Sequence, residues 1–286
     1  MEPIREAARA KLNLTLDVLG KREDGYHDLC MVMQSVALCD AVTIRRGEEE
    51  GIRVRSNLDF LPTGPTNLAA AAAIRLCEAA GRDWNGLEIR LDKTIPVCAG
   101  LAGGSSDAAA VLRGLNRGLE LGYSVEELAK IGEQVGSDVP YCVYGTTMRA
   151  EGRGEVLTPL PPLPWCYVVL CKPNFSVSTP DLFRRIDGVK LTCRPDTAGM
   201  EEALRAGDLA GAARRMYNVF EDVLSRPVGV AVAEIKAALI QAGALGACMS
   251  GTGPTVFGLF AELEPARTAC EMLKNLHPET FLTVTV

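Results

Sequence analysis

A glycine-rich segment, Pro96–Leu115, carries the strongest chemical signal in the chain and reads PVCAGLAGGSSDAAAVLRGL. The preceding residues 86–91 alternate in polarity like a half-buried strand, and the following apolar residues recur at helical spacing. Gly100, Gly103 and Gly104 allow a tight turn and a close approach of the backbone to a ligand. The helix start then offers unpaired N–H groups to an anion. The segment predicts a phosphate-binding loop, with a glycine-rich turn before a well-capped helix as the alternative.

This loop differs from two common nucleotide-binding loops. No Lys-Ser/Thr pair closes it as in a Walker loop, and the glycines at 100, 103 and 104 do not have G-x-G-x-x-G spacing. The spacing therefore argues against a dinucleotide-dependent oxidoreductase.

Residues 9–18 alternate strictly between apolar and polar side chains, which predicts a strand with Leu12, Leu14 and Leu16 facing the core. Lys11 and Asn13 lie two residues apart on the opposite face, so their side chains project together. They form either a solvated strand face or a pair of functional groups.

Two further places combine polar chemistry with a turn or a helix start. Tyr26 and His27 follow the polar turn 20–25, where they either bind a planar ligand or have a structural role. Asp138 falls in the first turn of a short helix, with Ser137 as its expected cap. An acidic residue is favoured there by the helix dipole alone.

The elements expected around these residues predict two domains, divided by the proline cluster 158–164 into 1–157 and 158–286. In the first, Asn67 precedes a helix that ends at Gly81, and Ser124 with Glu127 forms a capping-box pattern. Its expected strands are 29–38, 41–46, 52–56, 86–91 and 146–150, and its helices are 68–80 and 125–135. In the second, a strand, helices, two strands, a helix and a strand fit a split βαβ domain. Those strands are 165–171, 247–249, 255–260 and 281–286. The helices start near 178, 199, 228 and 265, and a further helix is expected over 208–224.

Composition restricts the class of protein. A net charge of −6 and a pI near 5.2 argue against a nucleic-acid partner. No apolar run is long enough to span a membrane, and the N-terminal residues do not resemble a signal or transit peptide. The ten cysteines include no C-x-x-C pair, which predicts a reduced, cytoplasmic protein.

Several motifs together carry a family resemblance over nearly the full length. The glycine-rich segment resembles the phosphate loop of the small-molecule kinases named for galactose, homoserine, mevalonate and phosphomevalonate, the GHMP superfamily. Four further segments narrow it to the kinases of 4-diphosphocytidyl-2-C-methyl-D-erythritol: residues 10–14, 25–29, 136–140 and 249–257. The resemblance implies an α+β fold with an N-terminal ATP-binding domain, a C-terminal ferredoxin-like split-βαβ domain and an active site in the cleft between them.

The family reaction transfers the γ-phosphoryl group of ATP to the 2-hydroxyl of the erythritol part, in the non-mevalonate isoprenoid pathway. The resemblance implies that Asp138 is the base and that Lys11 lies beside it and the γ-phosphate. It therefore favours a functional role over a solvated strand face for Lys11 and over helix capping for Asp138. Asn67 reaches the nucleotide, Mg²⁺ bridges the phosphates, and Ser106 is the candidate metal ligand. The residues expected to wrap the ATP phosphates are Pro96, Val97, Cys98, Ala99, Gly100, Leu101, Ala102, Gly103, Gly104, Ser105 and Ser106.

The same resemblance implies a site for a cytidine diphosphate group. Tyr26 and Phe183 sandwich the cytosine ring, and His27 and Asn13 hydrogen-bond the ring or its neighbours. Thr179 lies in the same wall, and the loop 250–253 lies near the substrate diphosphate. The expected partner is this small molecule, with no nucleic acid or membrane, for a monomer or a homodimer.

Two residues of the phosphate loop depart from the family pattern. Ala102 stands where many members have glycine, which predicts an ordinary backbone conformation at this position. Asp107 stands where others have asparagine, and it is expected to point away from the phosphates or to help place a cation.

The alternatives are a homoserine- or mevalonate-type kinase, or a non-catalytic nucleotide or sugar sensor on the same fold. Tyr26, His27 and Phe183 favour a cytidyl substrate over an aliphatic one, and the presence of both Lys11 and Asp138 argues against a sensor.

Overall fold

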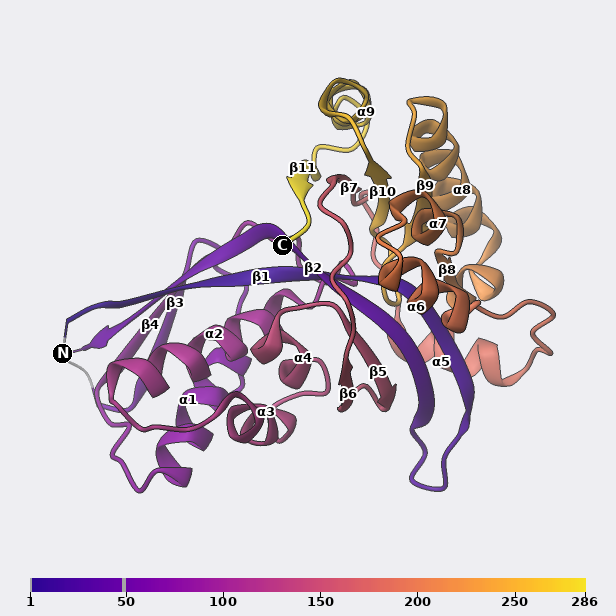
Figure 1. Cartoon of the computed structure of the whole chain (residues 1–286). Coiled ribbons are helices and arrows are strands. Elements are labelled where there is room, and N and C mark those ends of the chain that lie inside the picture. The colour runs from indigo at the N-terminus through magenta and orange to yellow at the C-terminus, as the bar shows by residue number, and fades with distance from the viewer. Residues whose placement is uncertain (1, 48–49) are drawn as a thin grey trace. The chain divides into compact units, whose positions relative to one another are not determined.

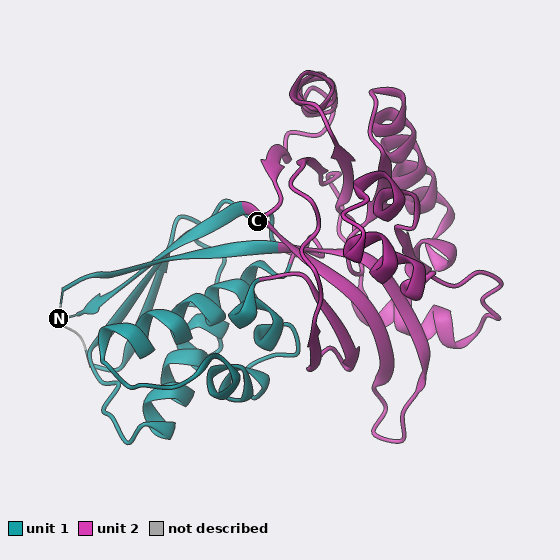
Figure 2. Ribbon diagram, in the orientation of Figure 1, with its two compact units in different colours: residues 1–10, 38–97, 102–145 teal, residues 11–37, 98–101, 146–286 magenta. Residues whose placement is uncertain are grey.

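The computed structural model describes residues 2–47 and 50–286, which form nine α-helices and eleven β-strands (Figure 1). They divide into two compact units whose segments interleave along the chain (Figure 2). Unit 1 comprises residues 1–10, 38–97 and 102–145, and unit 2 comprises residues 11–37, 98–101 and 146–286. The boundary predicted between residues 157 and 158 stays a prediction.

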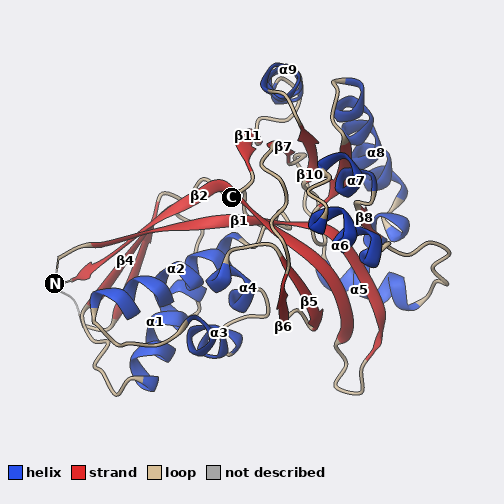
Figure 3. Cartoon of the chain, viewed as in Figure 1, coloured by secondary structure: helices blue, strands red, loops and turns tan. Residues whose placement is uncertain are grey.

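Unit 1 contains a sheet with helices on one face (Figure 3). In its sheet, β3 (Ile52–Ser56) runs parallel to β4 (Leu87–Asp92), which pairs antiparallel with residues 41–46 of β2 (His27–Arg46). Alternate side chains of these strands are buried, so the helices cover an apolar face. The helices are α1 (Leu68–Ala79), α2 (Gly103–Gly118), α3 (Val125–Glu133) and α4 (Val139–Tyr144).

Local sequence explains two of the four helix starts in unit 1. Asn67 caps α1 by accepting a 3.0 Å hydrogen bond from the backbone N–H of Ala69, and Ser124 and Glu127 form the predicted capping box. The predicted cap at Ser137 is wrong, because Asp138 itself is the N-cap of α4 and makes no side-chain cap hydrogen bond.

Unit 2 includes most of β1 (Ile4–Lys21), and the polar face of this strand is buried, contrary to the solvated strand face that was one of the two alternatives. Lys11, Asn13, Thr15 and Asp17 are buried, as are the apolar residues between them. A solvated strand face is therefore wrong. The two strands predicted over 29–38 and 41–46 are one continuous strand, β2. Its residues 29–33 pair with β5 (Met148–Gly152), which pairs with β6 (Val156–Pro159).

A second, four-stranded sheet in unit 2 has the order β11–β7–β10–β9 and confirms the predicted split βαβ arrangement. All its neighbours are antiparallel, and the last strand of the chain lies beside the first of the four. Helices α8 and α9 pack on the sheet. The elements are β7 (Tyr167–Cys171), α8 (Arg226–Gln241), β9 (Gly246–Met249), β10 (Val256–Phe260), α9 (Leu263–Lys274) and β11 (Thr280–Val284).

The helix predicted over 208–224 is wrong. Helix α7 ends at Arg214, and β8 (Tyr217–Asn218) pairs parallel with Thr15 and Leu16 of β1 before a 3₁₀ turn over Val219–Val223. Strand pairing with a segment some 200 residues away supplies backbone partners that a local pattern does not reveal. The remaining helices are α5 (Thr179–Asp187), α6 (Thr197–Arg205) and α7 (Leu209–Arg214). Within the described ranges no helix is long and apolar enough to cross a membrane.

Candidate active site

The middle of the glycine-rich segment, residues 98–101, is bound to a second glycine-containing loop, 250–255, within unit 2. Ser250 Oγ donates a 2.9 Å hydrogen bond to the carbonyl of Gly100, and the N–H of Thr255 donates to Ala99 at 3.3 Å. Gly100 has φ +77°, and a Cβ there would lie 2.1 Å from the carbonyl oxygen of Ser250. Only glycine allows the two loops to approach this closely.

Lys11 and Asn13 lie against these loops. Lys11 Nζ donates a 2.6 Å hydrogen bond to Asn13 Oδ1, and the N–H of Lys11 donates to the carbonyl of Leu101 at 3.1 Å. The N–H of Asn13 donates to Ser250 Oγ at 3.3 Å, and a Cβ on Gly251 would lie 3.4 Å from Lys11 Nζ. Unit 2 thus brings together a buried ammonium group, an amide and two glycine-containing loops.

The C-terminal part of the phosphate loop lies in unit 1, where it becomes the start of α2. Ala102 is the N-cap and has φ +55°, so the ordinary conformation expected for it is wrong. Gly104 is exposed and Ser105 half-buried, which leaves the first turn of the helix accessible to an anion. Ser106 is buried, and its hydroxyl donates to the carbonyl of Arg9.

Asp107 does place a cation, the ammonium group of Lys93. Lys93 Nζ donates to Asp107 Oδ2 at 2.5 Å and also to Asp40 Oδ2. Burial raises the pKa of Asp107 to about 7, and the nearby Asp40 carboxylate adds to the rise while Lys93 opposes it.

Phe183 and His27 form an aromatic contact in unit 2. Their ring centroids lie 4.6 Å apart with an interplanar angle of 26°, and Phe183 also packs edge-to-face with Phe220. His27 Nε2 lies 2.6 Å from Asp187 Oδ1, and Lys21 Nζ donates to the same carboxylate at 2.9 Å. The hydrogen bonds with His27 and then Lys21 lower the pKa of Asp187.

Tyr26 has a different neighbour in this structure. The residue is 58% exposed, and the guanidinium carbon of Arg153 lies 5.3 Å from the ring centroid. The predicted sandwich between Tyr26 and Phe183 therefore stays a prediction. Thr179, at the start of α5, hydrogen-bonds Thr252 of the 250–255 loop with 2.8 Å between the hydroxyl oxygens.

The two remaining predicted site residues lie in unit 1. Both polar atoms of the Asn67 side chain are hydrogen-bonded: Oδ1 accepts from the backbone N–H of Ala69, and Nδ2 donates to the carbonyl of Pro62 at 2.9 Å. Asp138 begins α4, which packs on α2 and α3. Lys11 belongs to unit 2, so its pairing with Asp138 stays a prediction.

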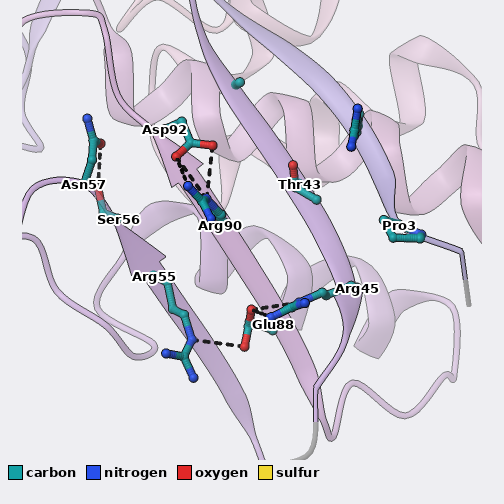
Figure 4. Close-up of a pocket in the computed structure, with 11 residues that line it drawn as sticks. Pro3, Thr43, Arg45, Arg55, Ser56, Asn57, Glu88, Arg90 and Asp92 are labelled. Atoms are coloured by element: carbon teal, nitrogen blue, oxygen red, sulfur yellow. Dashed lines mark hydrogen bonds and ion pairs between the residues drawn. The ribbon is translucent and has the colours of Figure 1, made fainter.

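A polar groove of about 940 Å³ lies on the face of the unit 1 sheet (Figure 4). Its arginines are largely neutralised by their own neighbours. Arg45 and Arg55 both contact Glu88, at 2.5 and 3.0 Å, and Arg90 lies 2.9 Å from Asp92. None of the predicted site residues lines this groove. Across the described part of the chain, no three His, Cys, Asp or Glu side chains form a metal-binding group.

Comparison with known proteins assigns the family. Residues 67–146 match the GHMP kinases N terminal domain, and residues 200–279 match the GHMP kinases C terminal domain. A 4-diphosphocytidyl-2-C-methyl-D-erythritol kinase of Lachnospira eligens is 46% identical over 271 residues, covering 95% of this chain and 93% of the relative. The kinase of the same name from Acetivibrio thermocellus is 44% identical and covers 100% of both chains.

The chain belongs to the 4-diphosphocytidyl-2-C-methyl-D-erythritol kinase family of GHMP kinases. A crystal structure of 4-(cytidine 5'-diphospho)-2C-methyl-D-erythritol kinase superimposes with a TM-score of 0.83 at 32% identity and covers 99% of each chain. A homoserine kinase from Cytophaga hutchinsonii, 21% identical with a TM-score of 0.76, shares the fold and covers 100% of this chain and 95% of that one. The predictions of family, α+β fold and enzyme class are confirmed.

Sequence reasoning missed three charged residues of this GHMP kinase: Arg153 and Asp187, which contact the predicted site residues Tyr26 and His27, and Lys93, which contacts Asp107 directly after the phosphate loop. Asp187 carried a signal, because an acidic residue at the C-terminal end of a helix opposes the helix dipole and so suggests a specific partner. Lys93 and Arg153 carried none, since isolated cations are common in loops.

Proposed function

We propose that this chain transfers the γ-phosphoryl group of ATP to the 2-hydroxyl of 4-diphosphocytidyl-2-C-methyl-D-erythritol, in the non-mevalonate route to isoprenoid precursors. The observation that carries the proposal is the buried Lys11–Asn13 pair, held against residues 98–101 and the 250–255 loop. Phosphoryl transfer depends on positioning and charge stabilisation, which a buried, hydrogen-bonded ammonium group can supply. The curated relatives that carry this activity in their names align over nearly the whole chain.

ATP is the co-substrate, and the glycine-rich segment would bind its phosphates. The first turn of α2, where Gly104 is exposed and Gly103 and Ser105 are half-buried, offers backbone N–H groups and the positive end of the helix dipole. Ser106 supports Mg²⁺ binding, because its hydroxyl donates to Arg9 and keeps oxygen lone pairs for a metal ion. Mg²⁺ prefers oxygen ligands and keeps few protein contacts beside phosphates and water, which this donor set fits. When bound with ATP it would offset the charge of the phosphates.

Asp138 would accept the proton of the attacking hydroxyl, and Lys11 would stabilise the negative charge that develops on the transferred group. In Lys11 the hydrogen bond to Asn13 limits the positions open to the ammonium group, so little reorganisation is needed during the reaction.

The second substrate would bind through its cytidine diphosphate part. Phe183 and Tyr26 offer aromatic faces for the base, and His27 adds an imidazole held by Asp187. Thr179 and Thr252 place two hydroxyls side by side for the polar remainder. We further propose that the enzyme works in the cytoplasm as a monomer or a homodimer.

The test is ADP release from the full chain with ATP, magnesium and the cytidyl-erythritol substrate. Asp138→Asn should abolish turnover while ATP still binds, because the base is lost and the phosphate loop is not. Undiminished turnover in that variant would remove Asp138 from the role of base.

A thermal-shift series separates the competing substrates. Cytidine diphosphate should raise the melting temperature, whereas homoserine and mevalonate should not. Stabilisation by homoserine or mevalonate alone, with their phosphorylation, would assign the chain to another GHMP kinase type. Binding of ATP and the cytidyl substrate without ADP release would indicate a sensor.

A further inference from the structure

Lys93 is almost completely buried between two carboxylates in unit 1, and the proposed reaction gives it no role. Its side chain is 4% exposed, and those of Asp40 and Asp107 are 0% and 4% exposed. Its ammonium group donates to Asp40 Oδ2 and, at 2.5 Å, to Asp107 Oδ2. Asp40 lies in β2, Lys93 directly follows β4, and Asp107 lies in α2. They are called the Lys93 clamp below.

The clamp holds the chain where it enters the phosphate loop. Asp40 Oδ1 accepts hydrogen bonds from the N–H groups of Thr94 and Ile95, at 2.5 and 2.8 Å. The backbone of Lys93 is itself bound twice to the side chain of Asn57, whose Oδ1 accepts at 2.8 Å and whose Nδ2 donates at 3.1 Å. Residues 93–95, immediately before Pro96, are therefore fixed by four hydrogen bonds to two side chains.

The clamp also holds the chain where it leaves the loop. Asp107 lies in the second turn of α2, and the ammonium group of Lys93 lies close to Gly103, the first residue of that helix. A Cβ on Gly103 would be 3.4 Å from Lys93 Nζ and 3.2 Å from Ile95 Cγ2. The ammonium group thus connects the entry of the loop to the helix start whose N–H groups would face the ATP phosphates.

A purely stabilising role accounts poorly for this arrangement. Three buried ionisable groups lose their hydration, and such groups rarely contribute more to stability than apolar residues of the same volume would. One carboxylate oxygen, Asp107 Oδ1, is buried without a hydrogen bond in the described part of the chain, which adds a further cost. What the clamp does provide is a fixed distance between the two ends of a glycine-rich loop that has little rigidity of its own.

We propose that Lys93 is a positioning residue for ATP, which acts through Asp40 and Asp107 to hold the two ends of the phosphate loop in their binding geometry. The proposal rests on the proposed function only in taking ATP as the ligand of the loop. Lys93 would not touch the nucleotide. Its loss would free residues 93–95 and the first turns of α2 to move relative to each other. Even a small misplacement of the groups that bind a ligand lowers affinity and rate by a large factor.

The experiment measures ATP affinity of the full chain by calorimetry, together with steady-state constants for both substrates. Lys93→Met should weaken ATP binding about tenfold or more, with the KM of the alcohol substrate changed less than about twofold. Lys93→Arg, which can contact both carboxylates, should recover most of the affinity. Lys172→Met is the matched control, because Lys172 forms a similar 2.5 Å ion pair with Glu279 in unit 2 and should leave ATP affinity unchanged.

A merely structural role predicts a different result. Loss of folded protein would lower the number of binding sites per chain but would leave the dissociation constant of the folded fraction unchanged. ATP affinity equal to that of the wild type in Lys93→Met overturns the proposal. Should that variant fail to fold, Asp107→Leu removes the acceptor for Lys93 on α2 and decides instead, with a weakening of about threefold or more expected and unchanged affinity overturning the proposal.

Failure of the proposed function gives a separate signature. If the cytidyl substrate is not phosphorylated by the wild type, calorimetry with ATP alone still measures the effect of the clamp. If the wild type does not bind ATP, both the proposed function and the clamp proposal are wrong.

Discussion

Lys11 Nζ donates a 2.6 Å hydrogen bond to Asn13 Oδ1, and only 5% and 0% of the two residues are exposed. A buried ammonium group needs such partners, because the loss of its hydration is otherwise costly. The strand period places the two side chains on one face of β1, and the backbone N–H groups of both residues bind the loops that cover this face. The pair is thus held by the same contacts that bring the 250–255 loop to residues 98–101.

Replacing Lys11 by Met tests this arrangement. The apolar side chain fills most of the volume but supplies no charge, so we expect kcat to fall about 100-fold or more. The unpaired Asn13 amide oxygen should lower the free energy of unfolding by about 1–3 kcal/mol. ADP release and urea unfolding measure the two effects. Lys130→Met removes an exposed cation from α3 and should leave both quantities unchanged, whereas a kcat within a factor of about three of the wild type in Lys11→Met would contradict the role of Lys11.

Replacing Gly100 by Ala tests the contact between the two loops. The new Cβ would lie 2.1 Å from the carbonyl oxygen of Ser250, in a residue with φ +77°. Gly122→Ala is the matched control, because Gly122 has φ +75° and open space around it, so it carries the backbone strain alone. Gly122→Ala should cost about 1–2 kcal/mol of unfolding free energy, and Gly100→Ala should cost at least about 2 kcal/mol more. Equal costs would show that the loops can separate without penalty.

The sequence predicts what local patterns determine. The capping box at Ser124 and Glu127 and the alternation in β1 both follow from short-range rules. The glycine-rich segment is predicted to open a helix, and α2 does begin at Gly103. These are the features whose partners lie within a few residues.

Features with distant partners could not be predicted in the same way. The polar face of β1 is buried, and Ser250, which accepts a hydrogen bond from Asn13, lies 237 positions later, so alternation alone makes this face look solvated. Ala102 adopts φ +55°, against the local preference of alanine, which only the surrounding structure can impose. His27 finds Asp187 across 160 positions, and no spacing rule relates them.

Replacing Phe183 by Ala tests the proposed site for the base. Stacking of a base on an aromatic side chain contributes about 1–3 kcal/mol, so the KM for the cytidyl substrate should rise about tenfold or more while the KM for ATP stays unchanged. Trp165→Ala removes another aromatic ring, which packs edge-to-face on Tyr167 in a residue that is 60% exposed, and it should change neither constant. A rise in both KM values, or in neither, would argue against a specific role for Phe183 in binding the base.

The raised pKa of Asp107 predicts a pH dependence of stability. The pKa is about 7 in the folded chain against 3.8 ordinarily, so between these values the folded state binds more protons than the unfolded state. The contribution of this group is therefore fully present below about pH 4, falls as the pH rises toward 7, and changes little above it.

Asp107→Asn removes the titration and keeps an acceptor for Lys93. Urea unfolding of both proteins at several pH values between 5 and 8 gives the difference in unfolding free energy, in which the other titrating groups largely cancel. The wild type should lose stability relative to Asp107→Asn, by up to a few kcal/mol, as the pH rises through this range. A constant difference would show that Asp107 is already ionised at pH 5 in the folded chain, with Lys93 outweighing the effects of burial and of Asp40 on its pKa.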